Sequence, residues 1–213
     1  MNTINFGDYN SFIDFSLILT GKTIGSPEPK TSIVEIEGGD GELDYTEYFG
    51  DVFFNNRTLT FDFETIISPS EFPSLFSQIQ NALHGKKMKV RLSEDSDFYY
   101  YGRVIVNEWK SNKRIGKITI EVDADPYKYR NFETIRTISV NDNTTNFVLN
   151  NLRKRATPSI EVSGEVTLTF ENTLYTLATG EYLDSSITLK EGNNYFIISG
   201  TGTITFKYQE GGL

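Results

Sequence analysis

The sequence contains no cysteine and a single histidine, His84, among its 213 residues. Without cysteine, disulfides and thiolate metal sites are excluded. One histidine excludes metal sites built from several imidazoles and catalytic networks that need a second histidine as base. We interpret His84 as a residue at the C-terminal end of a helix, where it favours the helix dipole. We therefore expect no catalytic residue, no metal and no cofactor, in a protein that is not an enzyme.

Long apolar runs and an excess of basic residues are also missing. No stretch approaches the ~20 apolar residues that a membrane-spanning helix needs, so we expect no membrane partner. The net charge is −9, and an acidic surface repels phosphate backbones, so we expect no nucleic-acid partner. The first residues read Met-Asn-Thr-Ile-Asn-Phe, without the basic stretch and apolar run of a secretory signal. We expect a protein that is made in a cytoplasm.

Alternation of apolar and polar residues dominates what is present. Aromatic residues make up 14% of the chain, and a period of two is typical of half-buried strands. It is clearest in residues 59–63, 118–122 and 204–208. Further strands are predicted at residues 15–19, 32–36, 88–92, 99–106, 159–162, 166–170 and 195–198.

One segment has helical periodicity instead. Phe72, Leu75, Phe76, Ile79 and Leu83 form a single apolar stripe that predicts a helix covering one face of a sheet. Its expected start is Ser68 as N-cap, Pro69 at the first helical position and Glu71 completing a capping box. Its expected end is Gly85, in the left-handed conformation that ends many helices.

The helix lies in the first part of the chain, and no helical pattern follows residue 130. We predict a mainly β fold with one helix. Residues 1–130 form a β-rich, ring-forming domain with a capping helix, and residues 131–213 form a C-terminal antiparallel β-sandwich of galectin-like or jelly-roll-like type.

The glycine-rich residues 38–41 resemble a phosphate-binding loop at first sight. They lack the Lys-Ser/Thr ending and open no helix, and five carboxylates nearby would repel phosphate. A turn between strands is the favoured interpretation, with calcium binding as a distant second.

Several acidic, aromatic and basic residues leave alternatives open. Glu94, Asp95 and Asp97 are interpreted as a solvated loop, with a polysaccharide-degrading acid–base pair as the alternative. Asp123 and Asp125, which precede Pro126, are interpreted in the same way. Residues 99–101 are three tyrosines, with alternate members expected to face a core, or else to anchor a sugar or protein.

Residues 86–91 contain four basic residues. They indicate an edge strand guarded by lysines, or else a basic contact surface for an acidic neighbour in a ring.

Several stretches, in order, resemble the distal tail protein (Dit) family of long-tailed phages of Gram-positive bacteria. Residues 36–46 read Ile-Glu-Gly-Gly-Asp-Gly-Glu-Leu-Asp-Tyr-Thr, and residues 54–63 contain an Asn-Arg strand start. The capped helix with Asn-Ala-Leu-His-Gly, a Tyr-Tyr-Gly-Arg stretch and Asp-Ala-Asp-Pro-Tyr follow. The C-terminal half matches more loosely, at residues 157–160, 191–194 and 200–208. The motif residues, with structural roles, are Gly38, Asp40, Gly41, Leu43, Asp44, Asn56, Arg57, Gly85, Tyr101, Gly102, Arg103, Asp125, Pro126 and Tyr127.

The resemblance implies a non-catalytic virion protein at the tail tip, assembled in the host cytoplasm as a homo-oligomeric, hexameric ring. Its implied partners are the tail tube protein, the tail-associated hub or lysin protein, and receptor-binding or baseplate proteins. The equivalent ring of a siphovirus or of a prophage-derived particle fits equally. The main alternative is a carbohydrate-binding module for cell-wall polysaccharide, with Tyr175, Tyr182 and Tyr195 as candidates for an aromatic platform.

Overall fold

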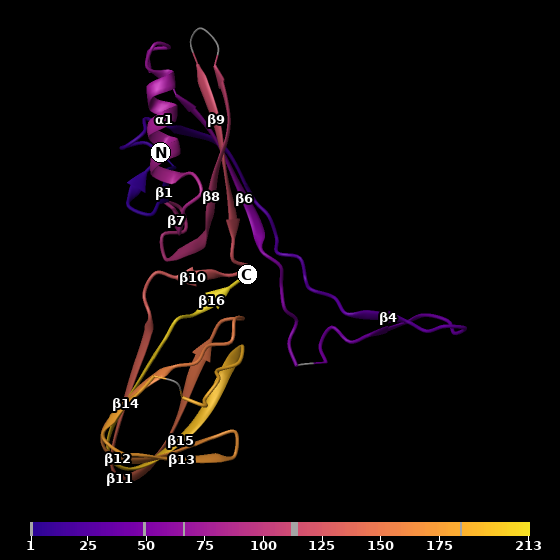
Figure 1. Cartoon of the computed structure of the whole chain (residues 1–213). Helices are drawn as coiled ribbons and strands as arrows, with labels where there is room; N and C mark the ends of the chain where they lie inside the picture. Colours follow the sequence, from indigo (N-terminus) through magenta and orange to yellow (C-terminus); the bar gives the residue numbers. More distant parts are fainter. Residues whose placement is uncertain (1, 49, 66, 112–114, 184) are drawn as a thin grey trace. The chain divides into compact units, whose positions relative to one another are not determined.

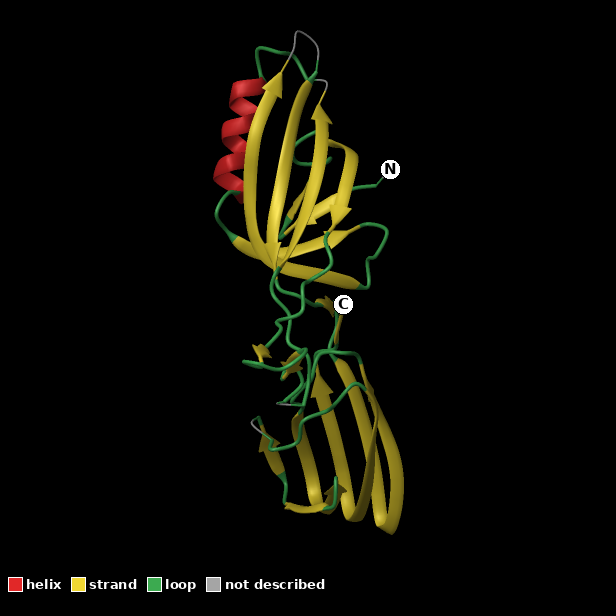
Figure 2. Cartoon of the chain, turned by 90° about the vertical axis from the view of Figure 1, so that its right-hand side faces the viewer, coloured by secondary structure: helices red, strands yellow, loops and turns green. Residues whose placement is uncertain are grey.

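The computed structural model describes residues 2–48, 50–65, 67–111, 115–183 and 185–213. These residues form two compact units, and the chain passes from the first to the second between Pro126 and Tyr127. Each unit has its own hydrophobic core. Strands dominate both units, and the described residues contain one α-helix (Figures 1 and 2). The predicted fold class, mainly β with one helix, is therefore confirmed.

The first unit contains a twisted antiparallel sheet and one helix. The sheet follows the order β2-β1-β7-β8-β9-β6-β3, and β4 and β5 form a separate hairpin. The bounds are β1 (Ile4–Phe6), β2 (Tyr9–Asn10), β3 (Ile18–Ile24), β4 (Ile33–Glu35), β5 (Glu42–Asp44), β6 (Arg57–Thr65), α1 (Phe72–Leu83), β7 (Lys87–Leu92), β8 (Phe98–Ser111) and β9 (Gly116–Ala124).

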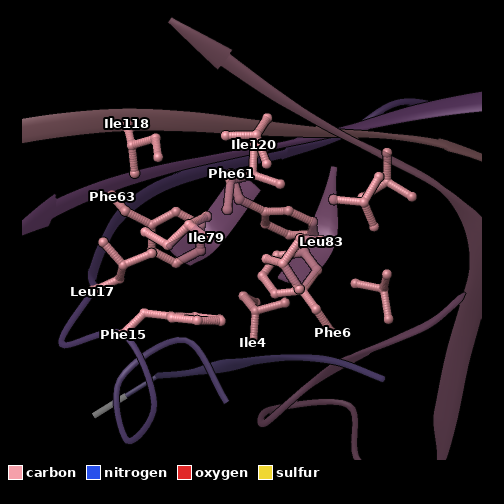
Figure 3. Packing of buried hydrophobic residues seen from close by; sticks show 14 of the residues in the cluster. Ile4, Phe6, Phe15, Leu17, Phe61, Phe63, Ile79, Leu83, Ile118 and Ile120 are labelled. Atoms are coloured by element: carbon pink, nitrogen blue, oxygen red, sulfur yellow. The ribbon is translucent and has the colours of Figure 1, made fainter. Parts of the chain in front are cut away.

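The core of this unit follows directly from the alternation in the sequence. Phe61 and Phe63 on β6 pair in register with Ile120 and Ile118 on β9, so one face of the sheet is apolar. The Phe6 ring packs against the Phe61 ring with centroids 5.9 Å apart. Figure 3 shows these residues gathered with the helix residues Ile79 and Leu83 and with side chains from the N-terminal segment. Full burial of each such side chain contributes about 1.5–3 kcal/mol to stability.

The helix begins later than the sequence indicates. Glu71, not Ser68, is the N-cap, and Pro73 rather than Pro69 occupies the first turn. Half of the predicted capping box nevertheless exists, because the Ser68 backbone N–H donates to Glu71 Oε2 at 3.2 Å. Gly85 follows the helix with φ +76°, as predicted for a left-handed stop. The Lys86 ammonium donates to the carbonyls of two residues in the last helical turn, Asn81 and Ala82.

The strand predicted at residues 15–19 is wrong over most of its length. Phe15 and Leu17 are buried, but Ser16 between them has φ +52°, which breaks an extended conformation. These residues form a tight turn with hydrogen bonds between nearby backbone groups. For example, the Leu17 N–H donates to the Ser11 carbonyl at 2.9 Å. Phe15 and Leu17 are therefore both buried, as in a strand with a period of two, although the left-handed Ser16 between them belongs to a turn.

The second unit is a sheet in the order β11-β15-β12-β13, with β14 also pairing β12 and a short β10–β16 pair. The strands β11, β12 and β15 are long. The bounds are β10 (Lys128–Arg130), β11 (Thr134–Asn151), β12 (Ser159–Phe170), β13 (Thr173–Leu177), β14 (Gly180–Tyr182), β15 (Gly192–Tyr208) and β16 (Gly211–Gly212). The two strands predicted at residues 159–162 and 166–170 are thus one strand, β12.

The three long strands of the second unit are sharply bent at one line. Phe196 and Phe206 are ten residues apart on β15, and a straight strand would separate them by roughly 33 Å. Their ring centroids lie 5.5 Å apart. The sheet is therefore folded over, so that its two halves face each other and enclose one core.

The bend runs through a line of glycines, which we call the crease. Gly164 on β12 pairs with Gly202 on β15, and Gly200 lies two residues away. All three have positive φ, of 97°, 158° and 110°. On β11 the same row carries a bulge between Asn141 and Asn143. Because glycine alone adopts such conformations readily, the crease is encoded locally.

Candidate functional site

Residues 26–48 and 50–56 form a narrow two-stranded arm of the first unit, between β3 and β6. Near its root the Lys30 N–H donates to the Phe53 carbonyl at 2.7 Å, and the Asn55 N–H donates to the Glu28 carbonyl at 2.8 Å. The β4–β5 hairpin forms its far end, where Val34 pairs with Leu43. Figure 1 draws the hairpin away from the sheet of the same unit. Isolated two-stranded hairpins are marginally stable in water.

The motif residues of the hairpin shape its turn. Gly38 and Gly41 have φ of +73° and +80°, and the Gly39 N–H donates to the Ile36 carbonyl at 3.2 Å. The turn connects two strands and opens no helix, as the turn interpretation of residues 38–41 predicts. Asp40 is exposed at its tip.

The two faces of the hairpin differ in chemistry. Strand alternation places Val34 and Leu43 on one face, where their side chains remain 50% and 45% exposed. Glu35 and Glu42 form a cross-strand pair on the other face, together with Asp44. A single chain leaves both faces in water.

Asp44 also fixes the base of the hairpin. Its Oδ1 accepts the Thr46 backbone N–H at 2.8 Å, and the Thr46 side chain and backbone hydrogen bonds lower the pKa of this carboxyl. A lowered folded-state pKa means that this contribution is present at neutral pH. It is lost as the pH falls below the ordinary value of 3.8 and through the folded-state pKa.

The arm holds most of the net charge of the protein. Residues 26–56 contain eight carboxylates and one lysine, a charge of −7 out of the −9 of the whole chain. The negative charge is therefore concentrated on the arm, whose hairpin is separate from the main sheet of the first unit.

A second group of motif residues meets where the arm joins the sheet. Arg57 is only 7% exposed, and its Nε donates to the Gly25 carbonyl at 2.7 Å while Nη1 donates to the Pro126 carbonyl at 3.3 Å. Its guanidinium lies 5.4 Å from the Tyr100 ring centroid. Arg57 therefore joins both ends of the arm root to the last residue of the first unit.

Neighbouring motif residues extend this junction. Asn56 donates to Asp123 Oδ1 at 3.0 Å, and the Asp125 N–H donates to the Tyr101 carbonyl at 2.9 Å. A side chain at Gly102 would collide with Asp123 O at 2.5 Å, so β8 and β9 approach closely there. These motif residues hold backbone together, and Tyr127 begins the second unit.

The single histidine has a structural contact that its position in the helix did not reveal. His84 is the C-cap of α1, and its Nδ1 accepts the Val106 backbone N–H at 3.0 Å. The ring therefore also binds β8, in addition to its predicted place at the C-terminal end of the helix. Beside it, Arg103 Nη1 donates to the Gly85 carbonyl at 2.5 Å.

Two of the loop carboxylates have structural contacts. Glu94 forms an ion pair with Lys22 and accepts the Asn2 side-chain N–H at 3.1 Å. Asp95 lies in a turn, where its N–H donates to the Leu92 carbonyl at 3.1 Å. Across the described ranges, no group of three or more His, Asp or Glu side chains is placed to hold a metal ion.

The basic residues after the helix do not form an edge strand. β7 pairs with β1 on one side and with β8 on the other, so the edge interpretation is wrong. Lys87 and Lys89 point to the outer face, where their ammonium groups lie 4.8 Å from the Tyr101 ring and 4.3 Å from the Tyr99 ring. Lys87 also pairs with Asp125 at 3.2 Å.

Most of the tyrosines that were candidates for sugar binding are buried or pack against a core. Tyr99 and Tyr100 are buried, and burial raises the pKa of Tyr99. Tyr175 and Tyr182 pack against the core of the second unit. Tyr195 is different, because it is 69% exposed. It borders an open groove of about 650 Å³ at the end of β11, β12 and β15.

The strand rows around Tyr195 are formed by uncharged residues, while Glu171, Lys190 and Glu191 line the adjoining groove. The register places Asn146, Ile197, Thr169 and Leu174 in one row across four strands. The next rows pair Val148 with Tyr195 and Asn150 with Asn193. These rows present amide, hydroxyl and apolar groups, in contrast with the acidic arm.

No protein-family model matches the chain, and no curated protein matches it. The structure is similar to the crystal structure of the SPP1 Dit (gp 19.1) protein, described as a paradigm of the hub adsorption apparatus in phages that infect Gram-positive bacteria. The TM-score is 0.71 at 16% sequence identity, over 98% of this chain and 99% of that chain. The fold of this chain is the fold of that protein. Among the described residues, no helix is long and apolar enough to cross a membrane.

Proposed function

We propose that this chain, whose fold is that of a phage hub protein, is a distal tail protein that forms the hub ring at the tip of a phage tail. The similarity over nearly the full length of both chains supports the proposal. In this role the protein is a non-catalytic virion component, assembled in the host cytoplasm. Its ring joins the tail tube protein to the tail-associated hub or lysin protein and to receptor-binding or baseplate proteins.

The arm is the observation that carries ring formation. A ring subunit needs two different complementary patches that repeat by rotation until the ring closes. The hairpin exposes an apolar face and an acidic face that its own unit leaves uncovered. Contact with another copy would cover both. We propose six copies per ring on the basis of the family resemblance.

Removing the apolar face of the hairpin should prevent assembly. We expect the double variant Val34→Ser/Leu43→Ser to shift the purified protein from rings to monomers. The two replaced side chains would no longer supply the apolar area that the contact between copies buries. Light scattering after size exclusion and negative-stain microscopy measure the shift.

The control changes two leucines of the second unit that are more exposed than Val34 and Leu43, Leu174→Ser/Leu183→Ser, and should leave the rings intact. A wild-type chain that stays monomeric at every concentration would contradict the proposed ring. Rings that persist in Val34→Ser/Leu43→Ser would show that another surface forms them.

A second candidate function is binding of cell-wall polysaccharide by the second unit. The exposed Tyr195 ring, beside a groove lined by Asn146, Asn172 and Asn193, favours it, because sugars bind aromatic faces and amide groups. Calorimetry with cell-wall polysaccharide tests it. We expect Tyr195→Ala to weaken any binding at least tenfold, about 1.4 kcal/mol. Tyr175→Ala, which alters a core contact instead, is the comparison. Wild-type protein that binds no polysaccharide removes this candidate.

A further inference from the structure

The outer face of β7 carries a run of cations, which is unusual in this acidic protein, although Asp125 already pairs with Lys87 and Asp123 stands in register with Arg103. Four of the six residues at positions 86–91 are Lys or Arg, and none is acidic. Lys87 pairs in register with Arg103 on β8, so the cations continue onto the next strand. We call Lys87, Lys89, Arg91 and Arg103 the basic strip.

The basic strip has an apolar floor. Tyr101 and Tyr99 lie under the Lys87 and Lys89 ammonium groups, and Ile105 is exposed farther along β8. Lysine stems that cross aromatic rings present charge at their ends and apolar surface between them. A segment that combines carboxylates with an aliphatic residue would therefore fit this surface.

The acidic face of the hairpin has that composition. It carries Glu35, Glu42 and Asp44, and Ile33 pairs in register with Asp44 on the same face. Glu35 and Glu42 stand opposite each other across the two strands. Like charges directly opposite are destabilising in a hairpin. Cations from another surface between these carboxylates would remove that cost.

The arm and the basic strip are set at different places in one sheet. The arm leaves between β3 and β6, at one end of the strand order, while β7 lies toward the other end with β8 and β9 between. Two complementary patches at different places on one subunit generate head-to-tail contacts, which close into a ring when the rotation allows.

We infer that the acidic face of the arm binds the basic strip of a second copy of this chain, and that this pairing is the repeating contact of the assembly. The inference rests on the proposed ring and assigns its two contact surfaces. Opposite charges attract over a Debye length of about 8 Å at physiological salt, and about 3 Å at 1 M. Assembly should therefore weaken as the salt concentration rises.

Charge reversal tests the pairing with the full chain. The arm-reversed variant is Glu35→Lys/Glu42→Lys, and the strip-reversed variant is Lys89→Glu/Arg91→Glu. None of the hydrogen bonds or ion pairs seen at Asp44, Lys87 and Arg103 is touched by these changes. We expect each variant alone to raise the concentration needed for half-assembly at least tenfold. An equimolar mixture should restore assembly, because every arm then meets an opposite charge in an alternating ring.

The control Glu133→Lys/Glu165→Lys changes the net charge as much as the arm reversal does, at two exposed positions of the second unit, and should assemble like the wild type. Circular dichroism verifies that each variant is folded. Variants that assemble normally, or a mixture that fails to recover, overturn the arm–strip pairing while leaving the ring itself in place. A wild-type chain that never assembles overturns both.

Discussion

Replacing Gly202 with valine is expected to prevent the second unit from folding. A Cβ at this position would lie 2.2 Å from the Ser163 carbonyl oxygen and 3.1 Å from Gly164 Cα. Both atoms are backbone of the paired strand, so no side chain can move aside. The φ of +158° adds strain for any residue with a side chain. The loss should exceed the 1–3 kcal/mol that is typical of overpacking, because the crease itself must open.

The effect should be confined to the second unit. Trp109 is the single tryptophan and packs on Phe72 and Phe76 in the first unit, with centroids 5.1 and 5.6 Å apart. Its fluorescence transition in urea should therefore be unchanged, while the far-UV circular dichroism loses the contribution of the second unit. Gly192→Ala is the matched control. It shares a positive φ of +84° but has open space around a Cβ, and should cost only about 1 kcal/mol. A folded Gly202→Val protein would contradict this account of the crease.

Removing the Arg57 side chain should destabilise the first unit and prevent assembly as well. The variant Arg57→Ala leaves the Gly25 and Pro126 carbonyls without their charged donor and removes the contact with Tyr100. Hydrogen bonds to charged groups contribute about 1.5–3 kcal/mol each and are not additive, so we expect a loss of about 2–4 kcal/mol. The arm root would no longer be held in one direction, so the hairpin would not reach its partner surface.

Urea unfolding followed by Trp109 fluorescence measures the stability, and light scattering measures assembly. Arg57→Lys keeps the charge but not the planar fork, so it should fall between the wild type and Arg57→Ala. Arg103→Ala removes an exposed arginine with a single bond to the Gly85 carbonyl and should cost less than 1 kcal/mol. An unchanged unfolding midpoint in Arg57→Ala would mean that the arm root is held by backbone contacts alone.

The elements with a clear local pattern could be predicted from the sequence. Alternation over residues 59–63 and 118–122 places Phe61, Phe63, Ile118 and Ile120 in the core, because strand geometry fixes which face each residue takes. The apolar stripe of α1 likewise packs where predicted, and its glycine end is correct. Its start is wrong because Ser68, Pro69 and Glu71 satisfy the capping rules one turn before the backbone becomes helical.

The features that depend on distant residues could not be predicted in this way. Nothing in the sequence of residues 86–91 indicates that β1, from the start of the chain, pairs with the edge of β7. The glycines at 164, 200 and 202 interrupt the alternation and imply separate strands, whereas the strands continue through them. A pattern read one strand at a time does not show that two glycines face each other.

The candidate site was partly predictable. The sequence indicated the motif residues of the hairpin and of the arm root. It did not indicate which of them lie next to each other in the fold. The buried position of Arg57 depends on Gly25 and Pro126, which lie 32 and 69 residues away in sequence. The charge of the arm is readable from the sequence alone, since residues 26–56 carry −7. The exposure of Tyr195, in contrast with Tyr175 and Tyr182, required the packed core.

The crease has a consequence for how the second unit opens. Because β11, β12 and β15 each contribute to both halves of the folded sheet, neither half can detach while the other keeps its hydrogen bonds in place. We expect backbone amides on either side of Gly164 and Gly202 to exchange with deuterium at a common rate, as one cooperative block. Under a pulling force, such a unit would resist and then release its length in a single event.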